Sequence, residues 1–177
     1  LRIVELGSEY IRIIKKPKFG YGKGMNPCLD CKILMLKKAK RFMKKFRAKF
    51  IITGDVLNER PTQTLSKLLL VEKEANLKGK ILRPLSAKLL PPTKAERYLD
   101  RNKLLAIRGR RRKVQLELAK KYGIKEFEWP GGGCILTHKE YAKKLKELLS
   151  RRKKVSLDEI KLLKIGRHFW INSSHII

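Results

Sequence analysis

Apolar residues along this chain switch repeatedly between helical spacing and short continuous runs. The spacing of Met35, Ala39, Phe42 and Phe46 predicts an amphipathic helix from about Cys31. Further segments follow in the same alternation: a buried strand over 50–52, a helix over 65–75, a strand over 80–85 and a helix over 111–122 that stops at Gly123. Alternating strands and helices favour an α/β fold with parallel strands.

The two ends of the chain predict further elements. Residues 2–6 alternate between apolar and polar positions, which predicts a strand. Thr137 with Glu140, and Ser156 with Glu159, each fit a capping box that opens a helix. We expect residues 1–150 to belong to one core and residues 151–177 to form a linker and the start of an appended small domain. Both ends of the sequence are expected to be cut inside an element.

The balance of charge indicates a partner. Lys and Arg number 45 against 16 Asp and Glu, which gives a net charge of +29. Repulsion among so many positive charges disfavours a compact state unless anions neutralise them. Nucleic-acid phosphates neutralise such charges while releasing counterions. The alternative is the Lys-rich surface of a thermophile protein, but those surfaces usually balance Lys with Glu. A nucleic acid is therefore the expected partner.

The chain shows no sign of a membrane segment. It has no apolar run near the roughly 20 residues that span a bilayer, and its first residues lack the layout of a signal peptide. A cytoplasmic protein with no membrane partner is expected. In that reducing compartment, the C-x-x-C pair Cys28 and Cys31 suggests metal or redox chemistry more than a structural disulfide.

The C-x-x-C pair lies where a loop meets the predicted helix. Cys31 falls in the first helical turn, where free backbone N–H groups favour a thiolate, and residues 32–49 add cations without any acid. This pattern predicts activated thiols with a lowered pKa. The alternative is a pair of half-buried structural cysteines.

A third thiol, Cys134, directly follows three glycines, which allow a close backbone approach. If it meets Cys28 and Cys31 in space, the three thiols could hold an iron–sulfur cluster of the 4Fe-4S type, or two of them could relay a persulfide. A closed zinc site that adds His138 is the alternative metal centre.

Other polar segments suggest contacts with phosphate or nucleotide. Asp55, Glu59 and Arg60 follow the strand over 50–52, so they could bind a nucleotide or cap the next helix, and the sequence leaves both open. The expected RNA-binding residues are Arg83, Lys88, Arg108, Arg110, Arg111, Arg112 and Lys113, because guanidinium groups suit phosphate. A solvated run of Arg is the alternative.

Several blocks together resemble the PP-loop ATP-dependent tRNA thiouridylases, or tRNA sulfurtransferases, in an archaeal and deep-branching bacterial branch related to the 2-thiouridylases. The blocks are NPCLDCK, TGDVLNERP, LRPLSAKLLPPT, DRNKLL, GRRRKVQLELAKKYGI and GGGCILT, and they cover roughly Tyr21 to Leu148. The resemblance implies the C-terminal half of a Rossmann-type parallel sheet with flanking helices, like that of adenine nucleotide alpha hydrolases. It also implies that a tRNA uridine is adenylated and its oxygen replaced by sulfur.

The resemblance also implies roles for particular residues. The active thiols, or metal ligands, would be Cys28, Cys31 and Cys134, and the nucleotide side would include Thr53, Gly54, Asp55 and Arg60. The family's Ser-Gly-Gly-x-Asp-Ser loop is absent from this sequence, and Asn58-Glu59 departs from the usual Gly-Gln. ATP with Mg²⁺ would therefore be bound mainly by a missing N-terminal part, and this piece alone is expected to be inactive.

Two further points stay open at the level of sequence. The sulfur donor could be a carrier protein or free sulfide, and a homodimer is compatible with the sequence. The rival function is a non-catalytic RNA-binding module whose Cys and His residues hold a structural metal. Reactive thiols would favour the enzyme, and inert zinc-bound thiols would favour the module.

Overall fold

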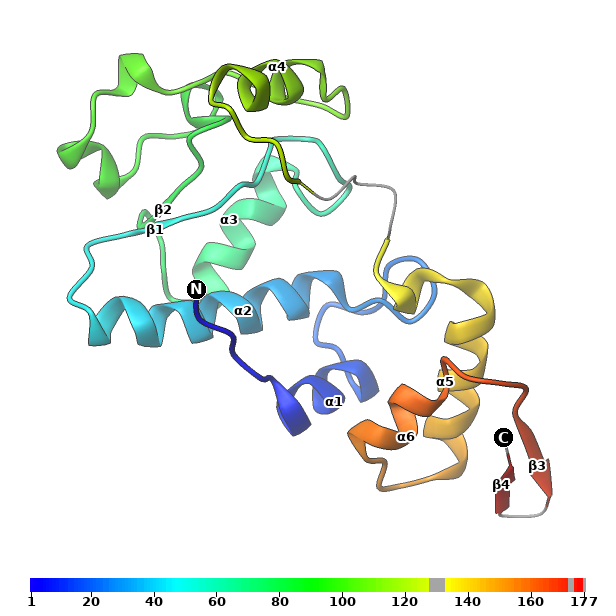
Figure 1. Cartoon of the computed structure of the whole chain (residues 1–177). Coiled ribbons are helices and arrows are strands. Elements are labelled where there is room, and N and C mark those ends of the chain that lie inside the picture. The colour runs from blue at the N-terminus through cyan, green and yellow to red at the C-terminus, as the bar shows by residue number, and fades with distance from the viewer. Residues whose placement is uncertain (128–132, 172–173, 177) are drawn as a thin grey trace. The chain divides into compact units, whose positions relative to one another are not determined.

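The computed structural model describes residues 1–127, 133–171 and 174–176, the last three through their backbone alone. The chain divides into two compact units. The first combines Leu1–Cys31 with Trp129–Ile177, and the second is Lys32–Glu128. Figure 1 shows the elements that make up each unit.

The first unit is mainly helical. Its elements are α1 (Gly7–Lys15), the first turn of α2 (Cys28–Lys45), the 3₁₀ helix η4 (Ile135–Thr137), α5 (Lys139–Arg151), α6 (Leu157–Leu162) and the antiparallel strands β3 (Phe169–Ile171) and β4 (Ser174–Ile176). Helix α1 contacts α6, and α5 contacts η4. The core gathers Ile14, Leu145, Leu148 and Leu163, each no more than 2% exposed. Burying these side chains supplies the main stabilisation of the unit.

The second unit is built around a short parallel pair of strands. Strands β1 (Ile51–Ile52) and β2 (Ile81–Leu82) pair in parallel. A parallel pair needs a crossover connection, and α3 (Leu65–Glu74) provides it. The unit continues with 3₁₀ helices η1 (Ala87–Leu89), η2 (Lys94–Tyr98) and η3 (Arg101–Lys103), and with α4 (Lys113–Lys121).

The pattern of helices and parallel strands agrees with an α/β class. The helices expected over 65–75 and 111–122 are confirmed as α3 and α4, and α2 begins three residues before the expected start at Cys31. The expected strands over 50–52 and 80–85 are present in shorter form as β1 and β2. Local apolar spacing was sufficient here, and α3 buries Leu68 and Val71 on one face.

Two expectations about the ends of elements were wrong. Residues 2–6 form no strand, and α1 begins just after them at Gly7. The Thr137 side chain does not cap α5, since its hydroxyl donates to the Cys134 carbonyl at 2.7 Å, and His138 occupies the N-cap position. The capping box at Ser156 and Glu159 is confirmed at the start of α6.

The structure divides the chain at other positions than the sequence suggested. Residue 150 lies within α5, and the described part of 151–177 belongs to the first unit. The assignment of 151–177 to an appended domain stays a prediction. Among the described residues, no helix is both long enough and apolar enough to span a membrane.

Candidate functional site

Two of the cysteines lie in the first turn of α2. Cys28 and Cys31 are three residues apart, a spacing that places both on one face of a helix. The Cys31 amide donates to the Pro27 carbonyl at 2.9 Å, which continues the helical hydrogen bonding at this end. Both thiols are free and partly buried.

The third cysteine approaches this turn through a close backbone contact. Cys134 immediately precedes η4, and the Met25 amide donates to the Leu136 carbonyl at 2.9 Å. Gly24 has a φ of +65°, and a Cβ there would lie 2.5 Å from the Leu136 carbonyl oxygen. Only glycine fits this contact without strain. The contact holds the turn after Cys134 against the segment that leads into α2.

Tyr10 of α1 lies among the three thiols. Its hydroxyl donates a hydrogen bond to the Cys31 sulfur. Burial raises the pKa of Tyr10, and negative charge on Cys31, Cys134 and Cys28 raises it further. The phenol therefore stays protonated and serves as a hydrogen-bond donor within the cluster of thiols. We call Tyr10, Cys28, Cys31 and Cys134 the thiol cluster.

The ionisation of Cys31 differs from the sequence-based expectation. Burial raises the pKa of this thiol, the Tyr10 hydrogen bond lowers it, and the neighbouring Cys28 and Cys134 raise it, with a net increase. The expectation of a lowered pKa for Cys31 was wrong, because it counted the helix end and nearby cations but not burial. Tyr10 partly offsets that burial.

An apolar cavity of about 190 Å³ adjoins the thiol cluster. Tyr10 and Cys134 line it together with Ile14, Tyr141 and Ile160, and Lys161 and Lys164 add positive charge to the wall. Cys134 is exposed, so it is accessible from solvent.

The thiol cluster is also the candidate metal centre. Within the described parts of the chain, no three His, Cys, Asp or Glu side chains are arranged to hold a metal ion. His138, the fourth ligand expected for zinc, is exposed at the N-cap of α5. The described geometry does not fit a closed metal site. The iron–sulfur cluster and zinc stay predictions of the sequence.

Asp55, one of the expected nucleotide-side residues, lies in a buried network. Its carboxylate accepts hydrogen bonds from Thr53 at 2.9 Å and from Gln63 at 3.2 Å, and it pairs with Lys32 and Arg83. Burial alone would raise the pKa of Asp55, but the hydrogen bond and charge of Lys32, with those of Gln63 and Thr53, lower it. Asp55 is thus a buried, ionised carboxylate that pairs with two cations.

Arg83 belongs to the same network and not to the exposed surface. The side chain is 3% exposed, and its Nη1 lies 2.5 Å from the Glu72 carboxylate. Glu72 also accepts from the Gly79 amide at 3.2 Å. The structure thus brings Asp55 and Arg83 together, although the sequence suggested a nucleotide contact for one and an RNA contact for the other.

The remaining nucleotide-side residues are placed differently. Gly54 and Arg60 are exposed after β1, whereas Thr53 bonds Asp55. Glu59 pairs with Arg112 at 3.2 Å. Helix α3 takes its cap from Thr64, so neither Asp55 nor Glu59 caps it. Their contact with a nucleotide stays a prediction.

The expected RNA-binding residues other than Arg83 are on the surface. Arg108, Arg110, Arg111, Lys113 and Lys88 are exposed, and Arg112 is partly buried beside Glu59. The Gly109 amide donates to the Leu57 carbonyl at 2.8 Å, which fixes the backbone of this Arg run against the segment after β1. We call Arg108, Arg110 and Arg111 the exposed arginine cluster.

Sequence reasoning missed Tyr10 and Lys32. Tyr10 shares α1 with Ile11 and Ile14, and a single tyrosine beside apolar positions carries no pattern that marks it as a thiol partner. Lys32 is one of many lysines, and its partner Asp55 is 23 positions away. In both cases the partner is known only once the chain is folded.

Comparisons with known proteins match the N-terminal half of the chain. Residues 8–88 match the family model described as "Thiamine biosynthesis protein (ThiI)". A "Probable tRNA sulfurtransferase" of Thermococcus kodakarensis is 41% identical over 64 residues, which are 36% of this chain and 16% of that protein. No solved structure matches the chain. The resemblance to tRNA sulfurtransferases is thereby confirmed. The family match over residues 8–88 includes Tyr10, Cys28 and Cys31 but not Cys134.

Proposed function

Starting from the likeness of residues 8–88 to ThiI, we propose that this chain is the sulfur-handling part of a tRNA sulfurtransferase. The observation that carries the proposal is the thiol cluster, where three free thiols lie near one partly buried phenol that is hydrogen-bonded to Cys31. Free thiols suit a reducing cytoplasm. In this proposal β1 and β2 belong to a larger PP-loop sheet, whose ATP-binding part acts on the same tRNA.

The proposed chemistry moves one sulfur atom. A persulfide on Cys134 attacks the carbon of an adenylated uridine, a carbon–sulfur bond forms, and the carbon–oxygen bond breaks as AMP leaves with the oxygen. The Cys31 thiolate then attacks the Cys134 sulfur, so that a Cys31–Cys134 disulfide forms and the outer sulfur stays on the base. A dithiol reductant restores both thiols.

The two thiols suit different parts of this sequence. Cys134 is exposed and can receive sulfur from a donor, whereas Cys31 is partly buried and hydrogen-bonded by Tyr10. That hydrogen bond stabilises the thiolate of Cys31 against the cost of burial, which favours attack on a neighbouring sulfur. Tyr10 is thus a positioning residue, and Cys28 is a second thiol that can resolve the disulfide.

The test loads the full chain with sulfur from inorganic polysulfide and maps each cysteine by alkylation and mass spectrometry. We expect persulfide on Cys134 first, followed by a Cys31–Cys134 disulfide within one chain, as the Cys31 thiolate attacks the inner sulfur and hydrosulfide leaves. The control is Ser150→Cys in a Cys134→Ser background, which offers an exposed thiol on α5. If the introduced thiol of the control loads as fully as Cys134 of the wild type, and no internal disulfide forms, the proposal is contradicted.

The rival RNA-binding module predicts another result. In that case the thiols resist alkylation until a chelator removes a tightly held metal, and polysulfide leaves them unchanged. Measuring zinc and iron in the purified chain before polysulfide treatment separates the two outcomes.

A further inference from the structure

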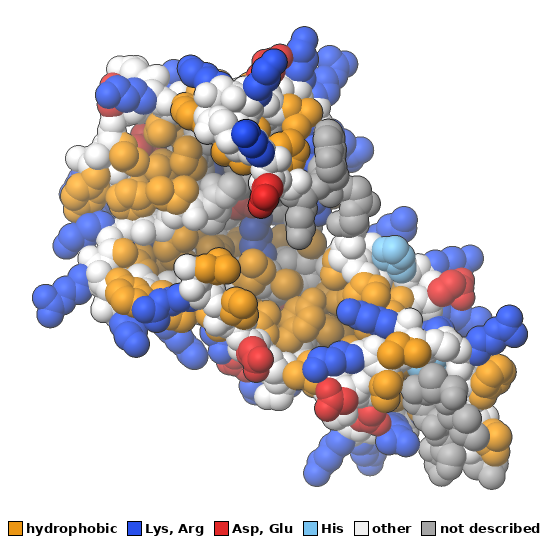
Figure 2. Space-filling model, viewed as in Figure 1, with side chains coloured by type: hydrophobic (Ala, Val, Ile, Leu, Met, Phe, Trp, Pro, Cys, Tyr) orange, Lys and Arg blue, Asp and Glu red, His pale blue; other side chains and the backbone are white. Residues whose placement is uncertain are grey.

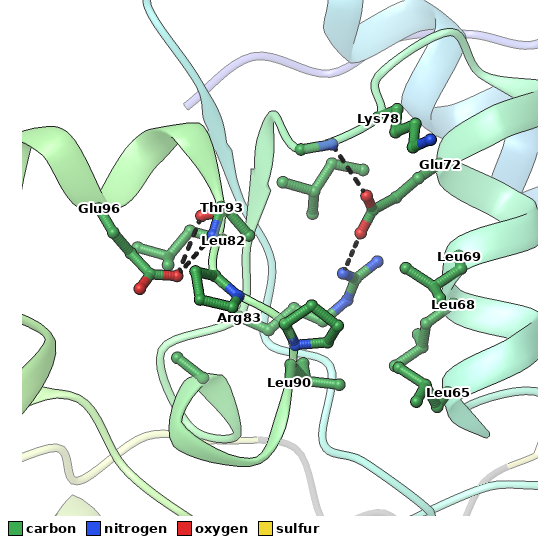
Figure 3. Close-up of a pocket in the computed structure, with 15 residues that line it drawn as sticks. Leu65, Leu68, Leu69, Glu72, Lys78, Leu82, Arg83, Leu90, Thr93 and Glu96 are labelled. Carbon is green, nitrogen blue, oxygen red and sulfur yellow. Dashed lines mark hydrogen bonds and ion pairs between the residues drawn. The ribbon is translucent and has the colours of Figure 1, made fainter.

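The cavity beside α3 is apolar and its charges are balanced (Figure 3). Its charged side chains are Lys78 and Arg83 against Glu72 and Glu96, so the charges cancel. Glu72 pairs with Arg83, and Glu96 accepts a hydrogen bond from the Thr93 amide at 2.8 Å. Among the described residues that line this cavity there is no cysteine. It therefore offers a ligand neither a reactive atom nor a surplus of one charge.

The cavity at the thiol cluster differs in its charge. Lys161 and Lys164 line it, and no acid is found among the described residues of its wall. Lys161 lies 3.2 Å from the exposed Asp158 carboxylate, whereas Lys164 has no ion pair within the described structure. The wall thus keeps a surplus of positive charge, which attracts an anionic group and disfavours a cationic one.

Apolar side chains form most of the same wall. Ile14 and Ile160 are 2% and 9% exposed, and Leu157, at the start of α6, is 38% exposed. Cavities that enclose drug-sized ligands measure roughly 300–1,000 Å³, so this cavity of about 190 Å³ takes a short chain or one end of a longer one. Cys134 also lines it. A ligand that suits this wall has an apolar body, an acidic end and a sulfur that can react with Cys134.

The proposed function requires a reductant of this kind, because each transfer leaves a Cys31–Cys134 disulfide. We propose that the cavity binds a short apolar carboxylate that carries a dithiol, the class to which dihydrolipoate belongs. One ligand thiolate attacks the Cys134 sulfur and Cys31 leaves as a thiolate. The second ligand thiol then displaces Cys134, and the ligand departs as a cyclic disulfide. Two electrons pass to the protein, and the two protons of the ligand thiols end on Cys31 and Cys134. This reduction rests on the proposed function, whereas binding of the carboxylate does not.

The first experiment measures binding to the full chain by NMR with octanoate, which has the apolar chain and the acid but no sulfur. Leu157→Trp fills the cavity, and Leu162→Trp is the matched control, because Leu162 is 42% exposed on the same helix and does not line the cavity. We expect Leu157→Trp to weaken octanoate binding about tenfold or more, because the chain loses its apolar contacts. Octanamide should bind roughly two- to fivefold more weakly than octanoate, the range that one exposed ion pair gives. Replacing Lys161 and Lys164 together by Ala should remove this preference.

A third variant checks the location of the ligand. Leu69→Trp fills the cavity beside α3 from a position that is 43% exposed. It should leave octanoate binding unchanged. Loss of binding in Leu69→Trp but not in Leu157→Trp would place the carboxylate beside α3 and overturn the proposal. Equal binding by Leu157→Trp and Leu162→Trp, or tighter binding of octanamide than of octanoate, would overturn it as well.

The second experiment follows reduction. The full chain is oxidised with diamide, the Cys31–Cys134 disulfide is mapped by mass spectrometry, and its reduction by dihydrolipoate, neutral dihydrolipoamide and dithiothreitol is timed. We expect the rate with dihydrolipoate to saturate, to exceed that with dihydrolipoamide and to fall in Leu157→Trp. Dithiothreitol, which lacks the apolar chain, should reduce all variants alike. Unsaturable rates that are equal in every variant would overturn the reduction step. If no Cys31–Cys134 disulfide forms, the proposed function and the reduction step fall together, whereas the octanoate results still decide the binding site.

Discussion

At the scale of single residues, the strongest effects come from partners that the sequence does not reveal. Tyr10 and Cys31 shift each other's pKa through their hydrogen bond, and the two residues come into contact only when the chain folds. Asp55 and Arg83 are 28 positions apart, yet they share one buried network. Sequence reasoning could nominate the cysteines and the acid, but it could not say which groups would set their pKa values.

The first prediction concerns the Cys31 thiol. Replacing Tyr10 by Phe removes the hydrogen bond that lowers the pKa of Cys31, while burial, which raises it, remains. The thiolate fraction at a given pH should fall, so alkylation of Cys31 by iodoacetamide should shift to higher pH. A Cys28→Ser background lets the peptide report Cys31 alone.

Tyr21→Phe is the control for this experiment. Its hydroxyl donates to the Ile14 carbonyl and not to a thiol, although it belongs to the same unit. The alkylation profile of Cys31 should stay at the wild-type pH in this variant. An equal shift in both variants would mean that loosened packing, and not the Tyr10 hydrogen bond, controls the thiol.

The second prediction concerns Asp55. Asp55→Asn leaves Arg83 and Lys32 with less compensating charge, and removing one partner of a buried ion pair costs about 3–5 kcal/mol. Urea denaturation at neutral pH should show that loss. Glu59→Gln, which breaks the more exposed pair with Arg112, should cost only about 0–1 kcal/mol.

The pH dependence of the Asp55→Asn effect follows from the sign of the shift. The pKa of Asp55 is lowered in the folded chain, so its stabilisation is fully present above the ordinary Asp pKa and is lost as pH falls through the folded value. The difference between wild type and Asp55→Asn should therefore persist at mildly acidic pH and shrink only in stronger acid. A difference that already vanishes at mildly acidic pH would contradict the network.

At the scale of elements, the chain was predictable where one segment carries its own pattern. The apolar spacing of α3 and α4 is complete within each helix, so their bounds were close to those predicted. Helix α1 was missed because its buried face amounts to Ile11 and Ile14, too short a pattern to stand out. The contact of Gly24 with Leu136 joins distant segments and could not be predicted from spacing.

The third prediction concerns the exposed arginine cluster before α4. Replacing Arg108, Arg110 and Arg111 by Ala should weaken tRNA binding for all sequences alike, because phosphate contacts carry no base information. The slope of log affinity against log salt should fall by about one per cation removed. Filter binding at several salt concentrations measures both. Arg112 is left in place because it pairs with Glu59.

The matched control removes the same charge elsewhere. Lys139, Lys143 and Lys146 are exposed along α5, so their joint replacement by Ala also removes three cations. We expect a smaller loss of affinity and of slope in this variant. Equal losses would indicate that tRNA binds diffusely to the positive surface and not at the exposed arginine cluster.

At the scale of the whole molecule, charge is the dominant feature. Lys and Arg are scattered over the face drawn in Figure 2, with few Asp or Glu among them. The described acids that lie deepest, Asp55 and Glu72, are already paired with internal cations. The net charge of +29 is therefore carried mainly by side chains that no internal acid compensates.

The last prediction follows from this imbalance. Uncompensated like charges destabilise a compact chain, and the Debye length falls from about 10 Å at 0.1 M salt to about 3 Å at 1 M. Sodium chloride should therefore raise the Tm, where each kcal/mol of stability corresponds to about 2–4 °C for a chain of this size. Replacing Lys139, Lys143 and Lys146 by Glu lowers the net charge by two at each position, so this variant should gain less from salt. If wild type and variant gain equally, general salting-out and not screened repulsion is responsible.

Because tRNA supplies anions at much lower concentration, it should stabilise the wild type in dilute buffer, and added salt should remove that gain by weakening the complex.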